Sequence, residues 1–391
     1  MLASILLFCF IGIGVGYVFL NLKKAVLCDM FSYKFRLYPS RQQEALLLMH
    51  FDLCRFTYNK LLEKLNSLKK IDRSVVQHSI VELKEEFPEL EAVYSKTLQY
   101  ECYRLFSNLR SLAQLKLNGH KVGGLRFKGR DWFKTIQYNQ SGFKFEQKTT
   151  RYGKLNLSKI GSIDIRSHRI TRGKIKQVTL KKGAGKWFAI LTTDAKYQKQ
   201  KGFGEIGLDV GVLNFAADSN GNVIGSPLFL KQSLGKIKQA HNGLSRKKKG
   251  SRRRWKAKQR LTRLYDKVNN QRCDFLHKLT TKIIKENKVI CIEDLNIREL
   301  IEKSRWNVRN FLDCSWAIFA RMLECKAESA GARCIRVNPR NTSKKCSNCG
   351  IVHKMPLNKR FYVCECGLKI DRDVNAAKNI LAQGLSFAKS L

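Results

Sequence analysis

The chain has 391 residues, enough for two or three domains, and its 43% of hydrophobic residues excludes a wholly disordered protein. Lysine and arginine number 75 against 31 acidic residues, a formal net charge of +44. Such an excess attracts polyanions, with nucleic acid the first candidate, although a ribosomal-type or membrane-surface binder would share it. Nine of the 13 cysteines are scattered and four cluster at 346–366, which favours a reducing cytoplasm over a disulfide framework.

The first segment, residues 1–29, is an apolar extension. Residues 1–22 carry no charge and are long enough to span a bilayer, so they predict a membrane anchor if they are translated. Met30, however, opens a pattern typical of a soluble domain. We therefore expect initiation at Met30, no stable membrane association, and a cytoplasmic, nucleoid-associated protein.

Residues 30–130 are predicted to form a strand followed by a helical nucleic-acid-binding module. Alternation over 31–37 indicates the strand, Pro39 ends it, and Ser40 is a suitable N-cap. Leucine and aromatic residues then recur at helical spacing until about residue 118. This apolar stripe is typical of a core.

Residues 131–203 are predicted to form a small β-rich, wedge-like module. Short strands are indicated at 155–157, 162–167, 175–182 and 186–194, with a turn at 183–185 making a hairpin of the last two. Basic and aromatic side chains on these strands could stack on nucleic acid, although a solvated surface explains each of them equally well.

Residues 204–391 are predicted to form an α/β domain. Three strands in series, with Asn220-Gly221 as a hairpin turn, favour an RNase H-like start. Helices are expected at 246–272, where Gly250-Ser251 offers a loop, at 311–330 and at 373–385, and strands at 288–292 and 333–339. The first helical segment holds thirteen Lys or Arg and one acid, a density that favours a phosphate backbone over a merely solvated face. The nucleic-acid contacts we expect there are Arg252, Arg253, Arg254, Lys256, Lys258 and Arg260.

Three acids stand at the ends of predicted elements. Asp209 and Glu293 end apolar strands, and Asp373 begins a helix. An acid at such a position is costly to bury without a partner or a metal, and converging carboxylates suit a two-Mg²⁺ site for phosphodiester hydrolysis. A helix cap is the competing interpretation for Asp373.

Four cysteines have the spacing of a structural zinc site. They read Cys346-x₂-Cys349, fourteen residues, then Cys364-x-Cys366. Four thiolates in two close pairs suit tetrahedral Zn²⁺, which would hold the polar loop between them folded. The second pair is tighter than the usual CxxC, and His353, between the pairs, is expected at the surface rather than as a ligand.

These motifs resemble the TnpB (OrfB) family of insertion-sequence-encoded nucleases related to type V CRISPR effectors. The resemblance rests on GLDVG, CIEDL, NPRNTSKKCSNCG and CGLKIDRDVNAAKNI, with weaker likeness in FRLYPSRQQ and GLRFKGR, and covers about residues 30–385. The apolar extension and the short cysteine pair depart from the pattern.

The resemblance implies an α/β RuvC-like (RNase H-like) nuclease domain over 204–391 with a zinc knuckle inserted at 340–370. It implies Asp209, Glu293 and Asp373 as the Mg²⁺-binding catalytic triad, target DNA and a guide RNA from the element as partners, and RNA-guided DNA cleavage. Three rival hypotheses are a guided binder that no longer cuts, a zinc-ribbon nucleic-acid binder, and a DNA-joining transposase. The three acids disfavour the first two, and the third lacks a tyrosine nucleophile motif.

Overall fold

The computed structural model describes residues 31–130, 133–149, 151–195, 202–303, 313–356 and 359–389. The expectations for residues 1–29 and Met30 therefore lie outside the described residues. The chain divides into two compact units, with the division between residues 196 and 197. Among the helices that the structure describes, none has the length and apolar composition to cross a membrane.

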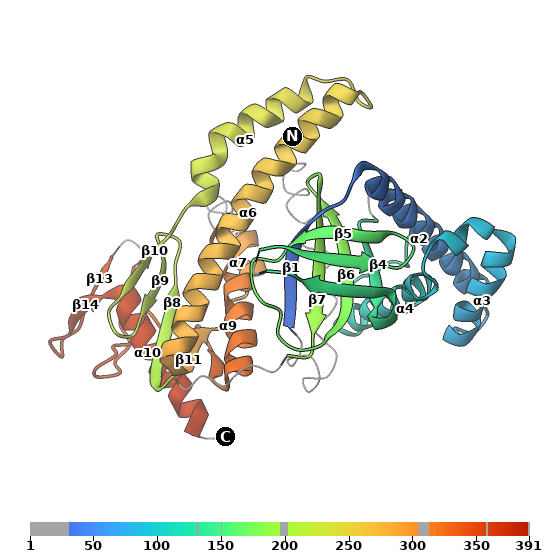
Figure 1. Cartoon of the computed structure of the whole chain (residues 1–391). Coiled ribbons are helices and arrows are strands. Elements are labelled where there is room, and N and C mark those ends of the chain that lie inside the picture. Colours follow the sequence, from blue (N-terminus) through green and yellow to red (C-terminus); the bar gives the residue numbers. More distant parts are fainter. Residues whose placement is uncertain are drawn as a thin grey trace. The chain divides into compact units, whose positions relative to one another are not determined.

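The first unit is built on an antiparallel seven-stranded sheet in the order β2-β6-β7-β1-β5-β4-β3. The sequence indicated β4 to β7 but not β2 and β3, which are only five residues each. β1 lies between β7 and β5, so the strand that opens the described chain completes a sheet formed 100 residues later (Figure 1). The strands are β1 Phe31–Tyr38, β2 Thr135–Asn139, β3 Phe143–Gln147, β4 Gly153–Leu157, β5 Gly161–Arg166, β6 Ile175–Gly183 and β7 Lys186–Thr193.

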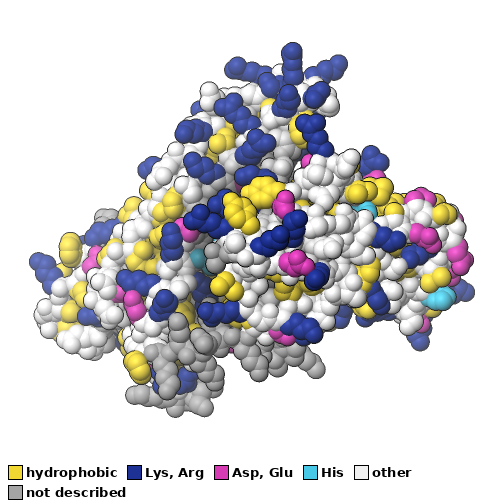
Figure 2. All heavy atoms as spheres, in the orientation of Figure 1, with side chains coloured by type: hydrophobic (Ala, Val, Ile, Leu, Met, Phe, Trp, Pro, Cys, Tyr) yellow, Lys and Arg dark blue, Asp and Glu magenta, His cyan; other side chains and the backbone are white. Residues whose placement is uncertain are grey.

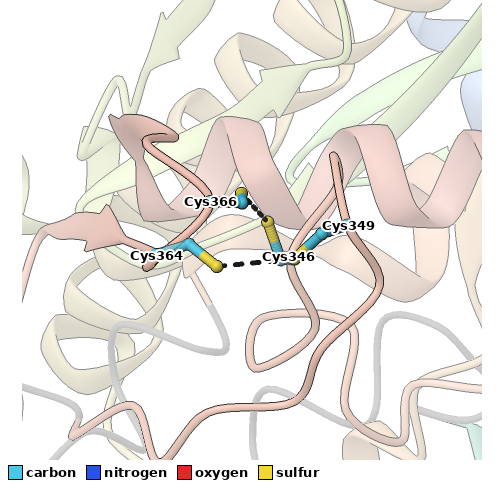
Figure 3. A group of neighbouring side chains, drawn as sticks. All are labelled: Cys346, Cys349, Cys364 and Cys366. Atoms are coloured by element: carbon cyan, nitrogen blue, oxygen red, sulfur yellow. Dashed lines mark hydrogen bonds between the residues drawn. The ribbon is translucent and has the colours of Figure 1, made fainter.

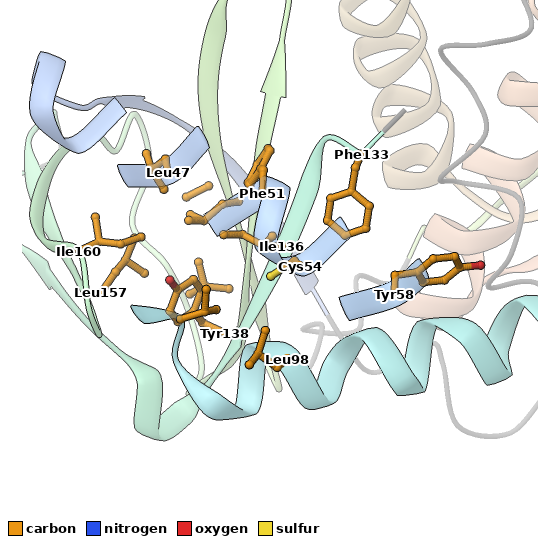
Figure 4. Close-up of a cluster of buried hydrophobic side chains, with 14 of the residues drawn as sticks. Leu47, Phe51, Cys54, Tyr58, Leu98, Phe133, Ile136, Tyr138, Leu157 and Ile160 are labelled. Carbon is orange, nitrogen blue, oxygen red and sulfur yellow. The ribbon is translucent and has the colours of Figure 1, made fainter. Parts of the chain in front are cut away.

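Helices of the same unit share one hydrophobic core with this sheet. Ser40 caps α2 in a capping box: its hydroxyl accepts from the Gln43 N–H at 3.2 Å, and the Gln43 side chain accepts from the Ser40 N–H at 3.0 Å. Such a cap contributes about 1 kcal/mol. Figure 4 shows side chains of α2, α4 and β2 meeting in the core. The helices are α2 Arg41–Ser67, α3 Arg73–Glu86, the 3₁₀ turn η1 Pro88–Ala92 and α4 Ser95–Leu117.

The second unit holds a five-stranded sheet in the order β10-β9-β8-β11-β12. β8, β9 and β10 pair antiparallel, while β11 runs parallel to both β8 and β12. The strands and helices predicted after residue 204 occur in the predicted order, but the structure adds helices at Phe229–Ser245 and Ile297–Lys303 and a two-stranded hairpin after β12, none of which the sequence indicated. The strands are β8 Gly204–Val210, β9 Asn214–Asp218, β10 Val223–Gly225, β11 Asn287–Glu293 and β12 Arg333–Val337, with a separate hairpin of β13 Phe361–Val363 and β14 Lys369–Asp371.

Two helix boundaries differ from the prediction. The basic stretch is interrupted at 246–251, which includes the loop offered at Gly250-Ser251 but begins earlier. The helices on either side pack as a hairpin, and the second runs on to Glu286 rather than ending near 272. The helix predicted over 311–330 is interrupted at Ser315, whose φ is positive at 56°: α9 begins at Trp316, Asp313 and Cys314 before it are also helical, and residues 311–312 lie outside the described residues. The helices are α5 Phe229–Ser245, α6 Arg252–Glu286, α7 Ile297–Lys303, α9 Trp316–Ala330 and α10 Arg372–Lys389.

Helices cover both faces of the five-stranded sheet. α6 and α9 pack on the face that presents Ile290 and Ile292, while α10 packs on the face that presents Val289 and Cys291 (Figure 1). This division follows from the alternation of side chains along a strand.

Glycine brings α10 unusually close to the sheet. A Cβ on Gly207 of β8 would collide with the backbone carbonyl of Ala377 and lie 2.8 Å from the backbone N of Leu381. At the other end of α10, a Cβ on Gly384 would collide with Cys291 of β11. Both positions need glycine because the atoms that an added Cβ would meet, backbone at Gly207 and a buried side chain at Gly384, have no room to move aside.

We predict that Gly207→Ala destabilises the second unit, because the new methyl group must push α10 away from β8. Such overpacking costs about 1–3 kcal/mol, or about 2–4 °C in melting temperature per kcal/mol. Gly225→Ala is the matched control, since nothing lies within 4 Å of its added Cβ. Calorimetric melting of both variants checks this, and equal melting temperatures would contradict the close packing.

Candidate active site and metal centre

The three candidate acids share the face of the sheet that α10 covers. Because Gly207 and Cys291 touch α10, alternation places Asp209 and Glu293, each two residues further along, on that same face. β8 and β11 are parallel neighbours, and Leu208 pairs with Ile292. Asp209 and Glu293 are the next residues on these two strands, so they lie at the same level of the sheet. Asp373 lies in the first turn of α10.

The electrostatics agree with a position of Asp209 near the other two acids. Burial raises the pKa of Asp209 well above its usual value, and the charges of Glu293 and then Asp373 raise that pKa further. Burial also raises the pKa of Glu293. No described side chain donates a hydrogen bond to Asp209. The charge of Arg372 lowers the pKa of Asp209, but its effect is smaller than those of burial and of the two neighbouring acids. A cation would offset the remaining cost of ionising these carboxylates.

The capping of α10 falls to Asp371, not Asp373. The Asp371 carboxylate accepts hydrogen bonds from the N–H groups of Asp373, at 2.8 Å, and Val374, at 3.2 Å. The Asp373 carboxylate instead lies 3.1 Å from the guanidinium of Arg372 and 3.5 Å from that of Arg360. The competing interpretation of Asp373 as a helix cap is therefore wrong.

Sequence reasoning missed a residue that contacts this cluster. Thr342, buried in the loop after β12, donates its hydroxyl to the Glu293 carboxylate at 2.6 Å. This hydrogen bond lowers the pKa of Glu293, against the larger effect of burial. The signal in the sequence was weak, because a threonine 49 positions from Glu293 has no spacing that links the two.

The four cysteines come together despite the short second pair. Their Sγ atoms all lie within 4.8 Å of one another (Figure 3). The Cys346–Cys366 and Cys349–Cys364 separations are 3.6 and 3.5 Å, close to the roughly 3.8 Å expected between sulfurs of a tetrahedron with Zn–S distances of about 2.3 Å. The residues therefore fit a structural zinc ion.

Hydrogen bonds and a packed aromatic pair surround this cluster. A hydrogen bond from the backbone N–H of Leu368, followed by one from the Asn348 side chain, lowers the pKa of Cys366 to about 6, whereas the pKa of its neighbour Cys364 is raised to about 12, in part by burial. His353 is half-buried, with its Nε2 3.2 Å from the Cys364 Sγ and its ring edge-on to Tyr362. The expectation of a surface histidine is corrected: it packs beside the cluster without being one of its four ligands.

Five of the six basic residues expected to contact nucleic acid are exposed near the start of α6, namely Arg252, Arg253, Lys256, Lys258 and Arg260. Figure 2 shows Lys and Arg side chains gathered at the free end of the α5–α6 hairpin. Trp255 stands among them, 60% exposed. The combination of cations and an exposed aromatic ring can hold phosphates and stack on a base.

Arg254, the sixth of these residues, has a structural role. Its Nη1 donates to the carbonyls of Leu244, at 2.8 Å, and Lys247, at 3.0 Å, at the end of α5. Ser251 caps α6 by accepting from the Arg254 N–H at 3.1 Å. Arg254 therefore joins the two helices at the turn of the hairpin.

Three family models match the chain. Residues 30–69 match a helix-turn-helix domain of OrfB, although here they form β1 and the single helix α2. Residues 189–304 match the OrfB model described as "Probable transposase", and this segment carries Asp209 and Glu293. Residues 316–380 match the TNB domain of Cas12f1-like proteins and carry the four cysteines and Asp373.

A Streptomyces pristinaespiralis protein named as an RNA-guided DNA endonuclease is 32% identical over 372 residues, covering 91% of this chain and 89% of the relative. The chain belongs to the TnpB (OrfB) family. Another member, InsQ of Escherichia coli K12, also named as an RNA-guided DNA endonuclease, is 29% identical and covers 90% of this chain and 92% of its own. The mimivirus TnpB-like protein L79 is 29% identical over 204 residues, 49% of this chain and 39% of its own length.

Two solved structures of nucleases align with this TnpB-family chain. The Cas12f1–sgRNA–target DNA complex gives a TM-score of 0.33 at 20% identity, covering 90% of this chain and 98% of that one. The mini-RNA-guided endonuclease CRISPR-Cas_phi3 gives a TM-score of 0.49 at 10% identity, covering 93% of each chain.

We predict about one Zn²⁺ per purified chain, because the four sulfurs already have tetrahedral spacing. Cys346→Ser and Cys364→Ser should each lose the metal and destabilise the loop it holds. Cys325→Ser is the matched control, since Cys325 is exposed on α9 outside the cluster. Elemental analysis measures the zinc, and a wild-type chain that is folded yet free of metal would refute the site.

Proposed function

We propose that this chain is an RNA-guided DNA endonuclease of a transposable element and that its second unit is a RuvC-like nuclease domain. The observation that carries the proposal is the desolvated cluster of Asp209, Glu293 and Asp373 on one face of the sheet. The strand order supports the RuvC-like assignment, with three antiparallel strands first and two further parallel strands beside β8. Guidance by RNA is supported by the names of the two relatives that align along most of this chain.

The three carboxylates would hold two Mg²⁺ ions. When bound, such ions activate a water and stabilise the leaving oxygen of a phosphodiester. Asp209 and Glu293 suit this role because burial raises the pKa of each, and the neighbouring acids raise that of Asp209 further. A divalent cation would stabilise the ionised form of both carboxylates. Asp373 is available because Asp371 has taken over the cap of α10.

The remaining residues would bind and place the nucleic acid. Arg360 and Arg372, the two arginines beside Asp373, are positioned to hold a phosphate near the carboxylates once a cation takes their place as the partner of that acid. The basic end of the α5–α6 hairpin would grip a phosphate backbone. The zinc-binding cysteines would keep the loop between β12 and α10 folded against the cluster.

Triad substitutions test the chemistry. The chain is purified with its cellular RNA, that RNA is sequenced, and a DNA duplex complementary to it, with randomised flanks, is offered in Mg²⁺. Asp209→Ala, Glu293→Ala and Asp373→Ala should each abolish cleavage while leaving nucleic-acid binding largely intact. Cleavage near the wild-type rate by any variant would remove that residue from the site.

The melting temperature of a variant shows whether it fails to cleave because a catalytic group is missing or because the chain is unfolded. An acid whose pKa is higher in the folded than in the unfolded chain lowers the free energy of unfolding as the pH rises from its ordinary pKa through the raised value. Asp209→Asn should therefore melt no lower than wild type at neutral pH without Mg²⁺, while still failing to cleave. Asp164→Asn, on the exposed side of β5, is the matched control and should cleave normally.

Salt dependence tests the basic hairpin. If Arg252, Arg253 and Lys256 each neutralise a phosphate, replacing all three with Gln should flatten the log–log salt slope of binding by up to about three units. Arg254→Gln should instead lower the melting temperature, since it removes two hydrogen bonds to the end of α5. Binding titrations over a range of salt concentrations give the slope. A slope unchanged in the triple variant would mean that this end of the hairpin is only a solvated face.

A further inference from the structure

We infer that Thr342 orients Glu293 in the carboxylate cluster and that the cysteine cluster holds Thr342 in place through two asparagines of α10. The inference rests on the proposed function, since it assigns a positioning residue to that site. It also makes the two proposed metal centres interdependent.

The contact between Thr342 and Glu293 is short and buried. The Thr342 hydroxyl lies 2.6 Å from the Glu293 Oε1 and 3.2 Å from the Pro339 carbonyl. A hydroxyl has only one hydrogen to donate, and a hydrogen bond to a charged group is stronger than one to a carbonyl. The hydroxyl of Thr342 therefore donates mainly to Glu293. A carboxylate with one oxygen held in this way keeps its other oxygen directed for a cation. Thr342 is therefore a positioning residue, and the cation contact belongs to Glu293.

The main chain of Thr342 is in turn fixed by α10. The Asn379 amide donates to the Thr342 carbonyl at 2.8 Å and to the Lys345 carbonyl at 2.7 Å. Asn379 is only 9% exposed. Two carbonyls three residues apart are thus held by one side chain.

The same loop is held at its first cysteine. Asn375, fully buried, donates to the Lys345 carbonyl at 2.8 Å and accepts from the Ser347 N–H at 3.0 Å. Lys345 and Ser347 are the neighbours of Cys346 on either side. Folding of the cysteine cluster around its metal would therefore fix the segment whose other end is Thr342.

The threonine has two informative replacements. Valine matches its shape but has no hydroxyl, while serine keeps the donor and loses only a methyl group. If Thr342 acts only by packing, valine should replace it without loss. If it acts by orienting Glu293, serine should replace it and valine should not.

The experiment measures Mn²⁺ binding to the full-length chain by calorimetry, with Asp209→Ala to identify the heat that belongs to the carboxylates. Thr342→Val should weaken Mn²⁺ binding about 10–100-fold, the usual effect of losing a hydrogen bond to a metal ligand. Its zinc content should match wild type. Thr342→Ser should restore Mn²⁺ binding. Wild-type affinity in Thr342→Val, or equal weakness in both variants, would overturn the inference.

A second arm tests the link to the cysteines. Asn379→Leu touches no carboxylate and no cysteine, yet should weaken Mn²⁺ binding, and Cys346→Ser should lose zinc and weaken Mn²⁺ binding together. A Cys346→Ser chain that loses zinc but binds Mn²⁺ as wild type would refute the coupling. Because Mn²⁺ binding needs neither guide nor target, a wild type that binds Mn²⁺ but cuts no guided target would refute the proposed function alone.

Discussion

The close approach of α10 to the five-stranded sheet is the constraint on which the second unit depends. Gly207 and Gly384 let the helix rest against β8 and β11 without a side chain between them. The helix then carries Asp373 to the acid-bearing strand ends and presents two asparagines to the cysteine loop. A helix held a methyl group further out would leave those acids apart and the loop without its hydrogen bonds.

This arrangement places unfavourable electrostatics at a defined position. Burying like charges together opposes folding. The three acids nevertheless stay together because the sheet, α10 and the loop after β12 each hold them in position. The surrounding core, built from Ile290, Ile292, Phe319 and their neighbours on the opposite face, offsets that cost. The larger core thus lies on the face of the sheet opposite the three acids, and a smaller one packs beside them under α10.

The sequence predicted what local periodicity and spacing encode. The Ser40 cap, the turn at 183–185, most of the order of elements after residue 204 and the meeting of the four cysteines all follow from short-range patterns. The helices α5 and α7 and the β13–β14 hairpin were not indicated. The structural role of Arg254, the contact of Thr342 and the amide bonds of Asn379 could not be predicted, since each depends on side-chain geometry or on partners up to 49 positions away. The start of α9 at Trp316 was missed because the apolar spacing continues upstream of the residue where the backbone changes direction.

The turn of the α5–α6 hairpin has a consequence for association. Arg254 ties the last turn of α5 to the first turn of α6, so the neighbouring cations extend from a helix whose start is already fixed. A flexible basic segment loses backbone conformational entropy when it is ordered on a polyanion, about 1–2 kcal/mol per residue. This hairpin has lost most of that entropy on folding, so its charges can bind with a smaller entropic penalty than an equally basic disordered tail.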